Sequence, residues 1–158
     1  MSRNLLKNPN GDEDLEFWEL TENGGSQWKV EDLPGDCGHD FTGQDGVSKY
    51  FATSFELCLK RQVINLLDEE YSAEVLDEQP LVNISDWYCA RTDCGCTYQM
   101  AVKCVTLDPE NDDCAWKEFS DYGPGLRFIT FEHGGQDTNY WDGWFGVRVT
   151  ASCVSIEN

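Results

Sequence analysis

The segment KYFATSFELCLK, Lys49 to Lys60, decides the fold, because residues of two kinds alternate along it. This period of two is typical of a half-buried β-strand. The predicted inward face carries Phe51, Thr53, Phe55, Leu57 and Leu59. The predicted outward face carries Tyr50, Ser54, Glu56 and Lys60.

Similar alternation recurs along the rest of the chain. It is clear at 97–106 and 145–156, and weaker at 28–31, 62–66, 81–88, 115–119 and 126–131. Gly, Pro, Asn and Asp mark turns between these segments, and only 68–78, ended by Pro80, has helical character. Many short strands at this spacing predict an all-β antiparallel sandwich with one short connecting helix. No repeat or linker divides residues 1–158, so we expect a single domain.

The charge of the chain excludes several classes of partner. There are 30 Asp and Glu against 11 Lys and Arg, a net charge of -19. Such a surface repels phosphate backbones and anionic lipids, so we expect no nucleic acid and no membrane partner. The N-terminal segment lacks the apolar core of an export signal, and no stretch is apolar enough to span a membrane. Nucleophile, P-loop, zinc-protease and dinucleotide motifs are absent from the sequence, so we expect no enzyme.

Eight cysteines raise the alternatives of disulfides, a metal site or reduced thiols. Cys104 and Cys153 continue alternating apolar faces, which predicts small buried side chains rather than disulfide partners. Cys89, Cys94 and Cys96 cluster, but they lack the second ligand pair that zinc sites usually show. We therefore expect reduced thiols in a cytoplasmic protein, with no metal and no cofactor.

The segment EHGGQDTNYWDGWFG, residues 132–146, places four large aromatics among glycines and polar residues. The glycines predict a loop rather than a strand. We expect Trp144 and Phe145 mainly to plug the end of the sandwich, next to the final strand. Tyr140 and Trp141 are expected to be exposed, where they are available to a ligand.

Several blocks of the chain resemble one known family. They are RNLLKNPNG, WKVEDLPGD, KYFATSFELCLKRQVINL, EQPLVNISDWYCARTDCG and DYGPGLRFITFEHGGQDTNYWDGWFGVRVTAS. In this order they are similar to the F-box-associated domain of sugar-recognising F-box proteins and of the non-specific cytotoxic cell receptor protein. The resemblance implies a jelly-roll-like, galactose-binding-like sandwich of two antiparallel sheets. The segment between Val105 and Trp116 is shorter than in the family, and no F-box precedes Arg3, so docking on a ubiquitin-ligase scaffold is not expected.

The resemblance also implies a ligand site in loops at one end of the sandwich, where glycan-binding members hold the chitobiose core of high-mannose N-glycans. The family's Tyr-Trp pair matches Tyr140 and Trp141, an aromatic matches Phe55, and an acid matches Asp93. An aromatic ring can cover the apolar face of a pyranose, and a carboxylate can accept hydrogen bonds from its polar groups. Two alternatives stay open: Phe55 belongs to the core or to the site, and Asp93 binds a ligand or closes its own turn.

Two residues depart from the glycan-binding members. Asp142 stands where a lysine follows the Tyr-Trp pair, so a donor is replaced by an acceptor. Cys37 stands in the LPGD loop in place of a more polar residue. The expected function is a cytoplasmic lectin-like domain that binds the inner N-glycan core of unfolded glycoproteins, with Asp142 and Cys37 adjusting its preference. The alternative is a protein-interaction or regulatory module whose loops bind a polypeptide or another small ligand.

Overall fold

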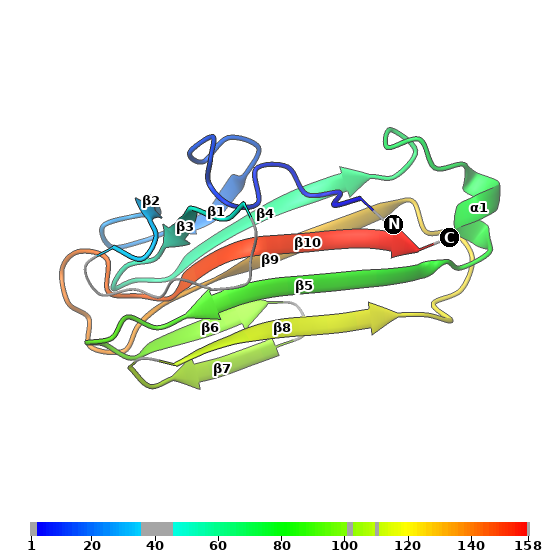
Figure 1. Ribbon diagram of the computed structural model, residues 1–158. Helices are drawn as coiled ribbons and strands as arrows, with labels where there is room; N and C mark the ends of the chain where they lie inside the picture. The colour runs from blue at the N-terminus through cyan, green and yellow to red at the C-terminus, as the bar shows by residue number, and fades with distance from the viewer. Residues whose placement is uncertain (1–2, 36–45, 101–102, 110, 158) are drawn as a thin grey trace.

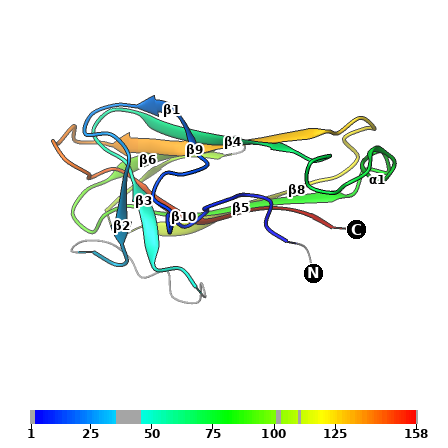
Figure 2. The same cartoon turned by 90° about the horizontal axis from the view of Figure 1, so that it is seen from above.

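The protein is an all-β sandwich of two five-stranded sheets in a computed structural model, which describes residues 3–35, 46–100, 103–109 and 111–157. The first sheet has the order β1 (Glu19–Asn23), β4 (Cys58–Asn65), β9 (Phe128–Asp137), β6 (Cys96–Met100), β7 (Lys103–Leu107). The second has the order β2 (Lys29–Asp32), β3 (Lys49–Ala52), β10 (Arg148–Glu157), β5 (Leu81–Cys89), β8 (Asp112–Phe119). Figure 1 looks onto the sheets, and Figure 2, turned by 90°, shows the two layers one above the other.

Every strand pair is antiparallel, which confirms the predicted fold class. The one helix among the described residues, α1 (Ala73–Asp77), connects β4 to β5 at the right-hand end of Figure 1. Its N-terminus is capped by Ser72, whose side chain accepts a hydrogen bond from the Val75 N–H. No helix in the described part of the chain is long and apolar enough to cross a membrane.

The prediction of one continuous strand over residues 50–60 is wrong, because this segment crosses from one sheet to the other. It forms β3 in the second sheet and β4 in the first, with an irregular crossing at 53–57. The crossing changes the alternation: Phe51 faces the core in β3, but Lys60, predicted to face outward, is fully buried in β4. Tyr50 and Ser54 are buried as well, on the predicted outward side. Side chains that point in either direction are buried here, because the segment passes from one layer of the sandwich to the other.

Three other predictions are corrected by the structure. The predicted strand at 97–106 is a hairpin of β6 and β7, in which Met100 pairs with Lys103. Cys104 is therefore exposed, and Cys153 is only half-buried, next to a bulge in β10. Strand β1 was not predicted, because ELTEN shows no apolar alternation.

Gly134 and Gly135 lie within β9 and are hydrogen-bonded strand residues, so the prediction that they mark a loop is wrong. Strands β4 and β6 flank them closely. A Cβ atom built on Gly134 would lie 1.9 Å from the Cys58 carbonyl oxygen, and one on Gly135 would lie 1.9 Å from that of Thr97. Glycine is required here by close backbone approach within a sheet.

The sandwich core contains a polar network as well as apolar side chains. Asp86 accepts hydrogen bonds from Ser152 Oγ, Tyr98 Oη and His133 Nδ1, each at 2.6 Å. Lys60 Nζ lies 2.7 Å from His133 Nε2 and 3.1 Å from the centre of the Trp18 ring. Burial lowers the pKa of His133 to about 4, so the ring is neutral at pH 7 and donates its Nδ1 proton to Asp86.

Candidate functional site

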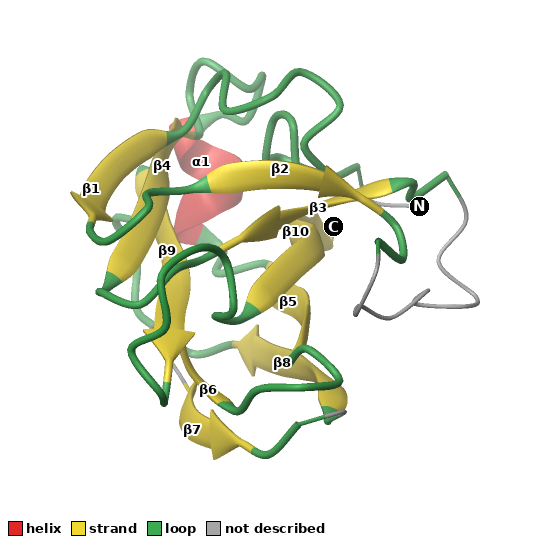
Figure 3. Ribbon diagram, turned by 90° about the vertical axis from the view of Figure 1, so that its left-hand side faces the viewer, coloured by secondary structure: helices red, strands yellow, loops and turns green. Residues whose placement is uncertain are grey.

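The loops that carry the predicted site residues gather at one end of the sandwich, opposite α1. They are 24–28, the 53–57 crossing, 91–95 and 138–147, and we call this end the tip (Figure 3). Tyr140 and Trp141 are 69% and 46% exposed, as the sequence predicted. Two adjacent exposed aromatic rings among loops give the tip an apolar surface, and we take it as the candidate site.

Asp137 shapes the loop that presents the two rings. It is buried at the end of β9, and its Oδ1 accepts hydrogen bonds from the backbone N–H groups of Asn139 and Tyr140. This is the local turn that an Asp forms with residues two and three positions later. Tyr140 itself has a φ of 57°, in the left-handed region. The turn therefore fixes the direction in which Tyr140 and Trp141 leave the sandwich.

Two serines tie this loop to the crossing that carries Phe55. Ser54 Oγ donates to the Gly143 carbonyl oxygen at 2.6 Å and accepts from the Ser26 N–H at 2.8 Å. Ser26 Oγ accepts from the Gly143 N–H at 3.1 Å. Phe55, next in the chain, is half-buried, so part of its ring stays accessible beside the same loops. Both predicted alternatives for Phe55, core and site, fit this position.

The carboxylate of Asp93 pairs with Arg91. The guanidinium Nε and Nη2 atoms lie 2.8 and 2.9 Å from the two carboxylate oxygens. The same guanidinium stacks over the Phe145 ring at 4.2 Å, and Phe145 contacts Trp141 edge to face at 5.3 Å. Asp93, Arg91, Phe145 and Trp141 therefore form one continuous row of side chains across the tip.

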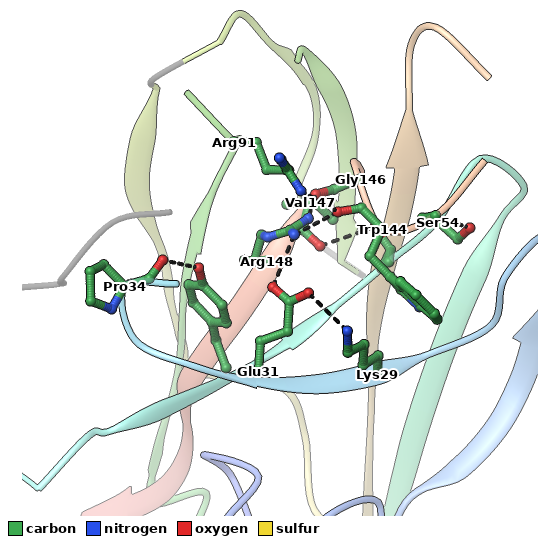
Figure 4. A network of polar contacts seen from close by, with 12 residues as sticks. Lys29, Glu31, Pro34, Ser54, Arg91, Trp144, Gly146, Val147 and Arg148 are labelled. Carbon is green, nitrogen blue, oxygen red and sulfur yellow. Dashed lines mark hydrogen bonds and ion pairs between the residues drawn. The ribbon is translucent and has the colours of Figure 1, made fainter. Parts of the chain in front are cut away.

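Arg148, buried on β10, holds the second half of the 138–147 loop (Figure 4). Its guanidinium donates to the carbonyl oxygens of Gly146 at 2.7 Å and Trp144 at 2.6 Å, and to Glu31 Oε1 at 3.0 Å. Trp144 is half-buried, donates from its indole to the Gln27 carbonyl oxygen, and lies 4.3 Å below Lys29 Nζ. Trp144 and Phe145 are both half-buried at the tip, and that they plug the end of the sandwich stays a prediction.

Of the six predicted ligand-binding residues, five lie at the tip. Phe55, Asp93, Tyr140 and Trp141 are placed above, and Asp142 is exposed next to Trp141. Cys37 lies outside the described residues. Sequence reasoning missed Arg91, Arg148 and Asp137, although an arginine inside the apolar run of β10 and an Asp before Thr-Asn-Tyr are detectable signals. Within the described residues, no group of three or more His, Cys, Asp or Glu is placed to hold a metal ion.

A family model described as the F-box associated region matches residues 1–113 and 108–156. The chain belongs to the F-box-associated family. Together the two matches cover nearly the whole chain, and they meet at 108–113, in the segment that joins β7 to β8. This agrees with the resemblance found in the sequence.

Curated relatives are F-box only proteins. The chain is 50% identical to F-box only protein 2 of Bos taurus over 98% of this chain and 59% of that protein. It is 45% identical to F-box only protein 6 of Mus musculus, over 100% of this chain and 60% of that protein. It thus spans about three fifths of the length of these relatives. The bovine alignment runs over 175 positions, so the relative has about 20 more residues in the matched region.

A solved structure supports the same fold. TmCBM61 in complex with beta-1,4-galactotriose superposes with a TM-score of 0.59, over 99% of this chain and 100% of that chain, at 12% sequence identity. This likeness places the chain among jelly-roll-like, galactose-binding-like sandwiches.

Proposed function

We propose that the tip is a lectin-like, non-catalytic site that binds the inner chitobiose core of high-mannose N-glycans on unfolded glycoproteins in the cytoplasm. The observation that carries the proposal is the exposed pair Tyr140 and Trp141, presented by a loop that Asp137 and Arg148 hold in place. A rigid, exposed aromatic surface suits a flat ligand with an apolar face, such as a pyranose. Membership of the F-box-associated family supports the same class of ligand.

In this proposal the tip residues divide the recognition between them. Tyr140, Trp141 and the accessible part of Phe55 cover the C–H face of a sugar ring. Asp93 accepts hydrogen bonds from hydroxyl or acetamido groups, and its pairing with Arg91 orients the carboxylate. Asp142, an exposed acceptor beside the platform, selects ligands that donate hydrogen bonds. Cys37 completes the set of proposed contacts from the LPGD loop.

The test is a titration of chitobiose and of a high-mannose glycopeptide into the wild-type protein and the Trp141→Ala variant. We expect Trp141→Ala to weaken binding at least about tenfold, with unchanged urea unfolding, because the ring is largely outside the core. Trp116→Ala is the matched control, since Trp116 is 61% exposed on β8, away from the tip loops. Equal loss in both variants, or no loss in Trp141→Ala, would refute the proposal.

Asp142 favours a second candidate, a protein-interaction or regulatory module of the same fold. An exposed acid where glycan-binding members carry a lysine suits a polypeptide or another donor-rich ligand. If wild-type protein binds no chitobiose and Asp142→Lys creates binding, the second candidate is supported. If wild-type binds and Asp142→Lys changes nothing, it is ruled out.

A further inference from the structure

The two sheets are unequally covered at the α1 end of the sandwich. In the second sheet, β8 pairs with β5 as far as Phe119 opposite Val82. In the first sheet, β6 pairs with β9 only from Asp137 to His133, and it ends at Met100. Among the described residues, the first half of β9, Phe128 to Glu132, therefore pairs with β4 alone.

Backbone groups of β9 are directed toward this uncovered side. The Leu66 N–H donates to the Arg127 carbonyl oxygen at 2.9 Å, so the backbone groups of Arg127 point toward the β4 side. Antiparallel pairing alternates, so the N–H and C=O groups of Phe128 and Thr130 point away from β4. No hydrogen bond from a described residue reaches these four groups.

A cavity of about 470 Å³ opens beside the same edge. Both sheets contribute apolar side chains to it: Val82, Ile84, Phe119, Met100, Ile129 and Phe131. Its outer wall is the 122–127 loop, which is held by α1 and the residues after it. Tyr122 Oη donates to the Pro80 carbonyl oxygen, and the Gly125 N–H and Arg127 donate to Asp77.

The relatives are longer than this chain in the matched region. They carry about 20 more residues there, and the two family matches overlap at 108–113, around the segment that joins β7 to β8. A longer β6 would run along the uncovered half of β9 and place alternate side chains between the sheets. This chain lacks that length of strand, while the edge and the apolar walls that would contact it are both present.

We propose that this edge accepts an extended segment of another polypeptide, which adds to β9 antiparallel in the place of a longer β6. Alternate apolar side chains of the segment fill the cavity, and its backbone pairs with Phe128 and Thr130. The residues of the segment between these apolar ones are basic. Among the described residues that line the cavity, Glu132 is the one that is charged, and the chain carries a net charge of -19. The same charge opposes a second copy of this chain as the occupant.

The probe is a labelled peptide, acetyl-KVKVKVK-amide, titrated into the whole chain at near-physiological ionic strength and followed by fluorescence anisotropy. Two control peptides separate strand addition from charge attraction. Acetyl-KKKKVVV-amide has the same composition without alternation. A version of the probe that is N-methylated at alternate residues lacks the backbone N–H groups along one of its edges, so that edge cannot donate hydrogen bonds to β9. We expect both to bind at least about tenfold more weakly than the probe.

The matched protein variants are Thr130→Pro and Thr130→Val. Proline removes the outward N–H of Thr130 without removing a hydrogen bond to β4, so Thr130→Pro should abolish binding, whereas Thr130→Val should retain it. Trp141→Ala, at the opposite end, should bind the probe like wild type. Should Thr130→Pro fail to fold, the N-methylated peptide with wild-type protein gives the same information.

Three results would overturn the proposal. Equal binding of the alternating and grouped peptides would show charge attraction alone. Binding that survives both N-methylation and Thr130→Pro would show that no strand is added. Concentration-dependent dimerisation in sedimentation that is lost in Thr130→Pro would make a second copy the occupant.

Discussion

At the scale of the residue, Asp86 joins donors from both sheets. Ser152 lies on β10 in its own sheet, while Tyr98 and His133 lie on β6 and β9 in the other. The Tyr98 hydroxyl stays protonated as a donor, because burial and the neighbouring carboxylate raise its pKa. Three donors satisfy the hydrogen-bonding capacity of the buried carboxylate. Each donor reaches it only when its strand is correctly aligned with β5. The network therefore contributes to the alignment of the two layers.

Lys60→Met tests how far this network depends on the buried amine. The change keeps the side-chain volume but leaves His133 Nε2 without its partner at 2.7 Å and removes the contact with Trp18. We expect the free energy of unfolding to fall by about 3 kcal/mol. Urea unfolding measures it, with Arg61→Met as the control, since Arg61 is the next residue of β4 and faces outward. Similar midpoints for the two variants would contradict a structural role for Lys60.

His133 predicts a pH dependence of stability. Its pKa is about 4 in the folded protein and 6.5 as the ordinary value, so below pH 6.5 the unfolded chain binds a proton that the folded chain does not. Stability is therefore complete above pH 6.5 and is lost as the pH falls, by about 2 kcal/mol between pH 7 and pH 5. Urea unfolding at both pH values measures the loss, and His133→Gln should show a smaller one. An unchanged loss in this variant would assign the effect to other groups.

Single residues differ in how well the sequence predicts them. Tyr140 and Trp141 were predicted to be exposed because their polar, glycine-rich neighbours cannot bury them. Lys60 was placed on the wrong face, because burial of an amine depends on His133 and Trp18, which lie far away in the chain. Local alternation contains no information about such partners.

At the scale of the element, turn and strand signals conflict where glycine is involved. Gly134 and Gly135 indicate a loop by local propensity, but the flanking carbonyl oxygens of β4 and β6 require them inside a strand. The 97–106 alternation likewise continues through a hairpin, so the period of two does not reveal the reversal. The sequence alone thus predicts the presence of most strands but neither these boundaries nor β1.

Gly135→Ala tests the close approach within β9. The new Cβ would lie 1.9 Å from the Thr97 carbonyl oxygen, so β9 and β6 must separate. We expect a loss of more than about 3 kcal/mol, from lost pairing and strain. Gly125→Ala is the control: nothing lies within 4 Å of its Cβ, and its φ of 106° carries only local backbone strain of about 1–2 kcal/mol. Urea unfolding compares them, and equal losses would show that conformation, not packing, requires Gly135.

At the scale of the whole molecule, the two ends of the sandwich have different chemistry. The tip presents aromatic rings and paired charges, whereas the α1 end has an apolar cavity beside unpaired strand edge. The resemblance in the sequence implied the first end by matching residues to a family. The second end depends on a strand that stops early, which only the arrangement of β6, β8 and β9 reveals.

The net charge of -19 makes a prediction for the molecule as a whole. Most of the 30 acidic side chains have no basic partner, because the chain has only 11 Lys and Arg, so mutual repulsion opposes the compact state. Added NaCl screens this repulsion, and we expect it to raise the melting temperature by roughly 2–4 °C, equivalent to about 1 kcal/mol. Thermal unfolding at low and near-physiological NaCl, with sucrose as an uncharged control, measures the shift. A fall in melting temperature on adding salt would show that the surface ion pairs, such as Arg127 with Asp77, outweigh the repulsion between the remaining acids.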